Sequence, residues 1–187
     1  MARKDKKSLV TPAREVAGPP DFPSAQPTLG CADLSELARS FWAKSGDGGS
    51  WLSVVQHLMD AADIAGFLFD DYLSEHHRRL MASVWGGDRA KARASFVFLA
   101  GIHDVGKVDI RFTCQRQDLA ELIRRQGLVV LRKRDYPERS LLPHGLVSQF
   151  AFQEEVAAGH GDGSRALQWA ILVGVHHGRY PDAGAVY

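Results

Sequence analysis

An apolar run that ends abruptly in charged residues constrains this sequence more than any other feature. The run extends from Phe96 to Ile102 and is followed directly by His103 and Asp104, with Gly106 and Lys107 shortly after. Burying two adjacent ionisable side chains is costly unless something compensates their charge. A divalent metal ion is one such partner, since a neutral imidazole and a carboxylate together suit Zn, Fe, Mn, Ni or Co. The run therefore predicts a buried segment that ends at a metal site.

More histidines stand in or directly after other predicted helices. They are His57, His144, His176 and His177. Adjacent residues on a helix point about 100° apart, so the pair His103 and Asp104 is poorly placed to chelate one ion. The pair is better placed to serve two neighbouring ions, with the carboxylate of Asp104 as the bridge. Six ligand-type residues without thiolates also exceed what one tetrahedral structural zinc would use.

The spacing of apolar residues predicts an all-α fold, and strand signals are weak. Helices are expected over about 33–42, 51–72, 89–105, 118–127, 143–158 and 165–175. Asp33 and Asp88 are expected to cap two of them. Gly106 is expected to end the central helix in a left-handed conformation, so that Lys107 projects from the helix end toward an anionic substrate. The segment 128–131 is either a short strand or the end of a helix.

Three further patterns have a simple or a functional interpretation. Asp60, three residues after His57, could hydrogen-bond that imidazole or share its metal environment. The doublet His76 and His77 is flanked by charged residues, so we interpret it as a solvated helix face. The most basic region is either a solvated face or a rim that contacts phosphates. Its candidate DNA-binding residues are Arg124, Arg125, Arg132, Lys133 and Arg134.

Composition and length suit one ordinary globular domain of 187 residues. Residues 1–30 carry five prolines and a basic start, and we predict a disordered leader there, followed by a domain over 31–187. The formal net charge of +1 argues neither for nor against a nucleic-acid partner. Two cysteines make no disulfide framework, and apolar runs stay far below the roughly 18 residues that span a bilayer. These features predict a cytoplasmic protein without a membrane span.

The ordered set of ligand-type residues resembles the HD superfamily of metal-dependent phosphohydrolases. Within it, the stretches 42–45, 56–58 and 103–107 resemble the HD nuclease domain of the CRISPR-associated helicase-nuclease of type I systems. The resemblance covers about residues 38–180 and implies an HD-domain helical bundle whose ligands come from several helices. It also implies a further acidic ligand downstream, for which Asp182 stands too close to the histidine doublet. We therefore expect the domain to be truncated at its C-terminal end.

The resemblance assigns a role to each site residue. It implies that His57, His103 and Asp104 hold one ion. Asp104 would bridge to a second ion held by His144, His176 and His177, and Lys107 would lie near the scissile phosphate. The implied cofactors are two divalent transition-metal ions, with Fe, Mn, Ni or Co as candidates. The implied partners are single-stranded DNA, a fused or separate helicase domain and an RNA-guided CRISPR surveillance complex.

The function that follows is hydrolysis of DNA phosphodiesters, in which Asp104 and Lys107 are the catalytic residues. Paired ions acidify water, polarise the phosphoryl oxygen and stabilise the departing alkoxide. Two alternatives stay open at this point. One is an HD phosphohydrolase that acts on nucleotides or a cyclic dinucleotide. The other is a module that binds metal, DNA or a protein partner without catalysis, because the last acidic ligand is missing.

Overall fold

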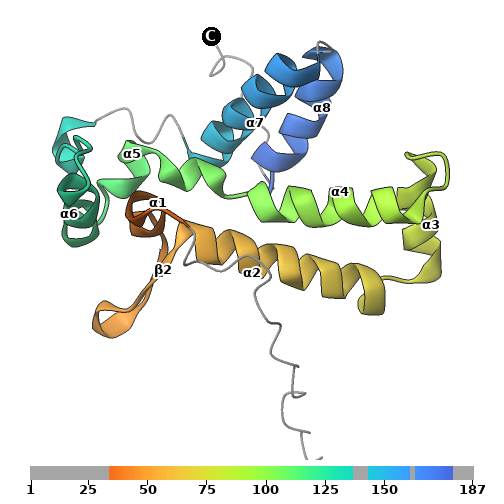
Figure 1. The fold of residues 1–187 in the computed structure, drawn as a ribbon, viewed down its shortest axis with the longest axis horizontal. Coiled ribbons are helices and arrows are strands. Elements are labelled where there is room, and N and C mark those ends of the chain that lie inside the picture. The colour runs from red at the N-terminus through yellow and green to blue at the C-terminus, as the bar shows by residue number, and fades with distance from the viewer. Residues whose placement is uncertain (1–33, 137–142, 161–162, 179–187) are drawn as a thin grey trace, which may run out of the picture. The chain divides into compact units, whose positions relative to one another are not determined.

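The computed structural model describes residues 34–136, 143–160 and 163–178, and all of them lie in the compact unit Cys31–Tyr187. The predicted leader 1–30 and Asp182 lie outside the described residues. The described part of the chain is helical apart from one small hairpin, so the all-α prediction is confirmed (Figure 1). Its helices are α1 Glu36–Ser40, α2 Val54–Phe67, α3 Glu75–Ser83, α4 Arg89–Ile102, α5 Ile110–Thr113, α6 Gln117–Arg125, α7 His144–His160 and α8 Gly163–Gly174. None of these helices is long and apolar enough to cross a membrane.

A β-hairpin includes the end of one predicted helix and the beginning of the next. Strands β1 Trp42–Ser45 and β2 Trp51–Ser53 pair antiparallel across a glycine-rich loop. Trp42 is buried, and its indole Nε1 donates to the carbonyl of Thr113 at 3.2 Å. This contact spans 71 residues and has no local signal in the sequence. The prediction of helix at Trp42 and Trp51 was therefore wrong.

Side-chain caps set where the helices begin. Ser35 caps α1 by accepting from the backbone N–H of Ala38, and Asp33 lies outside the described residues. Ser53 caps α2, which is why that helix begins at Val54 and not at residue 51. The capping role predicted for Asp88 is confirmed, because its carboxylate accepts from the N–H of Lys91 at 3.0 Å.

The central helix α4 connects two pairs of packed helices, because it belongs to one pair and contacts the other. α2 lies alongside α4, α7 packs along α8, and α8 also contacts α4 (Figure 1). The 3₁₀ turn Val105–Val108, which follows α4, packs against α7. This arrangement brings the ends of α4 and α8, the beginning of α2 and the beginning of α7 toward one point. Of the α4 residues only Ala92 is fully buried, so this helix does not run through the interior as its apolar sequence suggested.

Gly106 does not adopt the left-handed conformation expected of it. Gly178, which follows the histidine doublet, has a positive φ, whereas Gly106 is not among the described glycines with positive φ. α4 already ends at Ile102, and Gly106 sits inside the 3₁₀ turn. A Cβ atom there would lie 2.1 Å from the carbonyl oxygen of His144. Gly106 is thus required for a close approach between backbones and not for a chain reversal.

The remaining predicted boundaries are close to the observed ones. The helix expected over 118–127 is α6, Gln117–Arg125. Residues 128–131 form neither strand nor helix, although Val130 is buried. α7 extends to His160, past the expected end at 158, and α8 begins at Gly163, ahead of the expected start at 165.

Candidate metal centre

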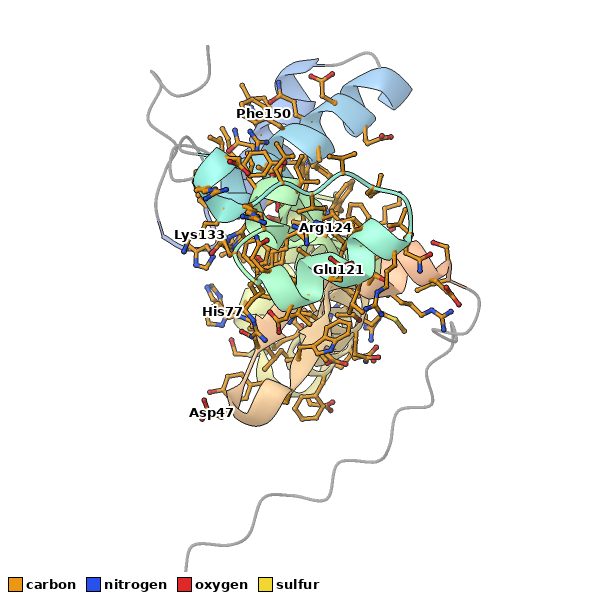
Figure 2. All side chains as sticks on the ribbon, turned by 90° about the vertical axis from the view of Figure 1, so that its left-hand side faces the viewer. Asp47, His77, Glu121, Arg124, Lys133 and Phe150 are labelled. Atoms are coloured by element: carbon orange, nitrogen blue, oxygen red, sulfur yellow. The ribbon has the colours of Figure 1, made fainter. Side chains whose placement is uncertain are left out.

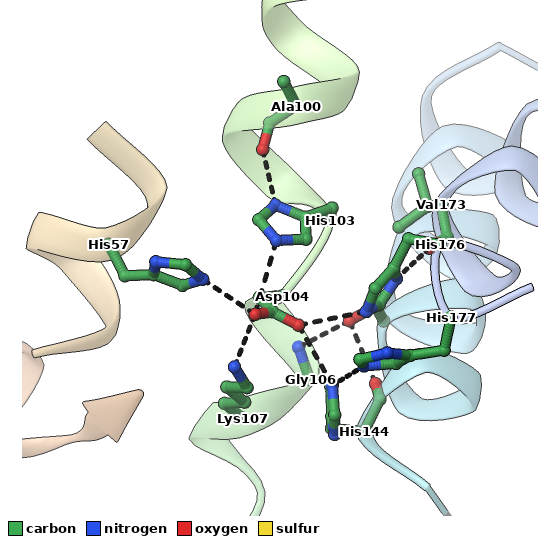
Figure 3. A network of polar contacts seen from close by, with 11 residues as sticks. His57, Ala100, His103, Asp104, Gly106, Lys107, His144, Val173, His176 and His177 are labelled. Carbon is green, nitrogen blue, oxygen red and sulfur yellow. Dashed lines mark hydrogen bonds and ion pairs between the residues drawn. The ribbon is translucent and has the colours of Figure 1, made fainter. Parts of the chain in front are cut away.

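Asp104 is the centre of the candidate site and is only 2% exposed. One carboxylate oxygen, Oδ2, faces the α2 side of the site (Figure 3). It lies 2.8 Å from Nε2 of His57, 3.3 Å from Nε2 of His103 and 2.5 Å from Nζ of Lys107. His57 comes from α2, while the other residues follow the end of α4. A first group of possible ligands therefore consists of His57, His103 and Asp104.

The second carboxylate oxygen, Oδ1, faces the histidine that begins α7 and the histidines that follow α8 (Figure 3). Nε2 of His144 and Nε2 of His176 each lie 3.1 Å from it. His177 reaches the same place, with its Nε2 2.8 Å from Nε2 of His144. Asp104 and these three histidines form a second group of possible ligands. The structure thus brings together all six residues singled out in the sequence, in two groups that share only Asp104.

Two of the imidazoles are oriented by the same local device. His103 Nδ1 donates to the carbonyl of Ala100, and His176 Nδ1 donates to the carbonyl of Val173, each at 2.7 Å. The last carbonyls of a helix lack intrahelical partners, so a histidine just past the helix end can satisfy one of them. The donated proton fixes the tautomer and leaves the Nε2 lone pair facing Asp104. This device explains why each apolar helix is followed at once by a ligand-type residue.

The charges around Asp104 favour its ionised form. Burial alone would raise the pKa of Asp104, but the surrounding imidazoles and the ammonium of Lys107 outweigh it and hold that pKa well below its usual range. Burial lowers the pKa of His57 and of His177, so both rings are neutral at pH 7. The hydrogen bond to Asp104 raises the pKa of His103, so this ring holds a proton more readily than His57 or His177. A metal ion bound here would displace that proton, because metal binding requires an ionised carboxylate and neutral imidazoles.

The residues present fit divalent metal ions. Oδ1 of Asp104 and Nε2 of His176 are both buried and face each other at 3.1 Å, yet neither has a partner in hydrogen-bond geometry. Buried polar atoms normally find a partner, and atoms of this kind point to a missing ion. The donor set is imidazole nitrogen and carboxylate oxygen without thiolate, which suits first-row transition metals.

Lys107 does not project from a helix end, as the sequence suggested. It is 4% exposed, and its ammonium is turned inward onto Asp104. Burial lowers the pKa of Lys107 despite this carboxylate, and the nearby ammonium of Lys44 lowers it further. Lys107 therefore compensates the charge of the central carboxylate, and two ammonium groups gather on the β1 side of the site.

The other sequence candidates lie away from the centre. Asp60 accepts a hydrogen bond from Gln56 at 2.6 Å and is not among the clustered ligands, so the expected link to His57 was wrong. His76 and His77 are exposed on α3, as predicted.

The predicted DNA-binding residues occupy the end of α6 and the segment after it (Figure 2). Arg124 is partly buried, and its guanidinium donates to the carbonyl of Val130 at 2.7 Å, to Gln117 and to Glu121. It therefore holds the chain after α6 in place. The remaining basic residues of the set are exposed. They are Arg125, Arg132, Lys133 and Arg134.

Ser148 supports the site but was missed in the sequence. It is fully buried on α7, four residues after His144. Its hydroxyl donates to the carbonyl of His144 at 3.0 Å and accepts from the N–H of Gly106 at 2.8 Å. It thus joins the turn that follows Asp104 to the helix that carries His144. The four-residue spacing permits the bond within α7, but the partner on the other side is 42 residues away and leaves no local signal.

Comparisons with known proteins point to one family. The family model described as "Cas3, HD domain" matches residues 42–186. The chain is 27% identical over 162 residues to the CRISPR-associated nuclease/helicase Cas3 of Streptococcus thermophilus, covering 76% of this chain and 16% of the relative. It is 28% identical over 146 residues to the CRISPR-associated endonuclease/helicase Cas3 of Thermus thermophilus, covering 78% and 15%. A crystal structure of a CRISPR-associated protein superposes with a TM-score of 0.67 at 28% identity, covering 80% of this chain and 16% of the other.

Proposed function

Because this chain belongs to the Cas3 HD domain family, we propose that it is a metal-dependent nuclease domain that hydrolyses phosphodiesters of single-stranded DNA in type I CRISPR interference. The family resemblance seen in the sequence is confirmed by these matches. HD domains of this family bind divalent metals and act as nucleases, so the coarse activity follows from membership. The observation that carries the proposal is the convergence of five histidines on the two oxygens of Asp104.

The chain's own residues would prepare the site in three ways. Asp104 presents one oxygen to each ligand group, which fixes the two groups side by side. The backbone anchors of His103 and His176 keep their Nε2 atoms facing the carboxylate, so no reorientation is needed. Lys107 compensates the charge of Asp104 and keeps a cation beside the centre, where positive charge would stabilise a phosphoryl group that becomes more negative in the transition state. Divalent ions held here would lower the pKa of water and polarise the phosphoryl oxygen.

The proposed partners follow from the names of the two relatives. Both curated relatives are named as fused nuclease–helicase proteins, and this chain spans about a sixth of their length. We propose that a helicase domain, on the same chain or on another one, delivers the strand to this site. An RNA-guided surveillance complex that opens the target duplex would supply that strand.

A substrate panel tests the proposed function. Metal-free protein is loaded separately with Mn, Fe, Co or Ni and incubated with labelled single-stranded DNA, duplex DNA, nucleotides and a cyclic dinucleotide. We expect cleavage of the single strand with at least one of the metals, little cleavage of the duplex, and no activity after chelation. Hydrolysis of nucleotides with intact DNA would favour the nucleotide phosphohydrolase. Metal retained without turnover on any substrate would favour the binding module.

The exposed basic segment is expected to contact the DNA backbone. We predict that the triple variant R125Q/R132Q/R134Q binds single-stranded DNA more weakly. If all three guanidiniums contact phosphates, the slope of log K against log salt should fall by about 2, at about 0.7 for each phosphate contact. Fluorescence anisotropy across a salt series measures this slope, and metal content should not change.

A matched control separates the segment from overall charge. The triple variant R79Q/R89Q/K91Q removes the same charge from α3 and α4, where each residue pairs with a carboxylate of Glu75 or Asp88. It should bind DNA almost as the wild type does. An equal loss of affinity in both variants would contradict a local role for the segment after α6.

A further inference from the structure

An apolar cavity of about 430 Å³ adjoins the metal centre and shares two residues with it. The cavity lies among α3, α4 and α8. His103 and His176 line it, and both have an Nε2 atom that faces Asp104. Any group bound in the cavity would therefore lie directly beside the proposed ions.

Two indole rings give this cavity a flat aromatic wall. Trp85, after α3, and Trp169, on α8, have ring centroids 5.7 Å apart and planes inclined by only 25°. Trp85 keeps 37% of its surface exposed, although it is large and apolar. Stacked, partly open aromatic rings are the surfaces on which planar rings of a ligand bind. Phe96 and Leu99 of α4 line the cavity beside them.

The remaining lining has no group that could balance a charge. None of the described residues that line the cavity is Lys, Arg, Asp or Glu. The single hydroxyl is that of Ser95, and it already donates to the carbonyl of Lys91 at 2.9 Å. A phosphate would be poorly compensated here, whereas an uncharged planar ring would lose little on leaving water. The metal centre has the opposite preference, so the two adjoining sites suit a ligand with one anionic and one aromatic part.

We infer that this cavity binds the nucleobase next to the scissile phosphate. The inference rests on the proposed nuclease function and adds a base-binding subsite to it. A base can enter such a cavity only after it has left its neighbours in the stack, so single strands are favoured over duplex. Because the lining offers stacking surface and almost no hydrogen-bonding groups, binding is independent of base identity.

Substitution of the more exposed indole tests the subsite. Protein loaded with Mn is titrated with a fluorescent single-stranded phosphorothioate oligonucleotide. We expect Trp85→Ala to raise the Kd about tenfold, in line with the loss of one stacked base, and Trp85→Phe to recover most of the affinity. Trp51→Ala is the matched control, because Trp51 is 38% exposed on β2 and does not line this cavity. All variants should keep their metal content and far-UV circular dichroism.

A substrate without a base gives an independent reading. A single abasic site is moved along a DNA strand, and cleavage is mapped at each bond. Cleavage should weaken at the bond beside the abasic site and stay normal elsewhere. If neither the Trp85→Ala substitution nor the abasic site changed cleavage, the base-binding subsite would be overturned, while the proposed nuclease function would still hold. Metal-loaded wild type that cuts no DNA would instead overturn the nuclease proposal, and the subsite with it.

Discussion

Asp104→Asn is expected to abolish metal retention and DNA cleavage together. The two carboxylate oxygens face separate groups of histidines, and an amide can supply only one oxygen, without the negative charge. Both ligand groups would therefore lose their shared member. We expect metal content by mass spectrometry to fall to background and cleavage to fall by about a thousandfold or more. Retention of metal and activity in this variant would show that Asp104 is not the bridge.

Loss of metal must be separated from loss of fold. Asp104→Asn leaves the ammonium of Lys107 buried without its counter-charge, which can cost about 3–5 kcal/mol when one partner of a buried pair is removed. The double variant D104N/K107M removes both charges and keeps similar side-chain volumes. It should recover much of the stability of the single variant in urea unfolding. Its metal content should stay at background, which would assign the loss to the missing carboxylate.

Single histidine variants distinguish a bridge from an ordinary ligand. His57 belongs only to the group around Oδ2, and His144 belongs only to the group around Oδ1. His57→Ala and His144→Ala should each reduce metal content by about half, whereas Asp104→Asn removes all of it. His77→Ala is the matched control, because this imidazole is exposed on α3 outside the site. A loss of all metal from either site variant would mean that the ions bind cooperatively.

The positions of the candidate ligands were predictable because they leave a local signature. An apolar helix that stops at His103 and Asp104, and another that stops at His176 and His177, mark two helix ends that meet in the interior. Asp104 is shared between the two groups, as expected, but neither His103 nor Asp104 lies in α4. Both belong to the group that contains His57, so the expectation that this pair is poorly placed to bind one ion was wrong. The structure adds that His103 and His176 are held by the same backbone contact, three residues earlier in the chain.

Features that depend on distant contacts were not predictable in the same way. The β1–β2 hairpin contains only short strands, and Trp42 is placed by a hydrogen bond to Thr113 far along the chain. Lys107 was expected to project from a helix end toward an anionic substrate, since the helix dipole favours a cation there. Instead the buried charge of Asp104 draws its ammonium inward. A charge inside the protein can thus reverse a preference that the local sequence indicates.

Gly106→Ala is expected to destabilise the domain strongly, although it adds a single methyl group. The new Cβ would lie 2.1 Å from the carbonyl oxygen of His144 and 2.6 Å from the backbone nitrogen of Ser148. Both are main-chain atoms of α7 and cannot rotate away as a side chain could. Relief requires α7 to move off the 3₁₀ turn, which also breaks the bond from the Gly106 N–H to Ser148. We expect a loss of about 3 kcal/mol or more in urea unfolding.

Gly101→Ala is the matched control, because it adds the same methyl group within α4. Its Cβ would meet the side chain of Ala62 at 3.3 Å, a contact that a small shift relieves. Its stability should change by less than about 1 kcal/mol, since alanine also favours the helix over glycine. Moving α7 displaces His144 from Asp104, so Gly106→Ala protein that still folds should lose metal from the Oδ1 group first. Equal stability and metal content in the two variants would mean that this backbone contact does not hold the metal centre together.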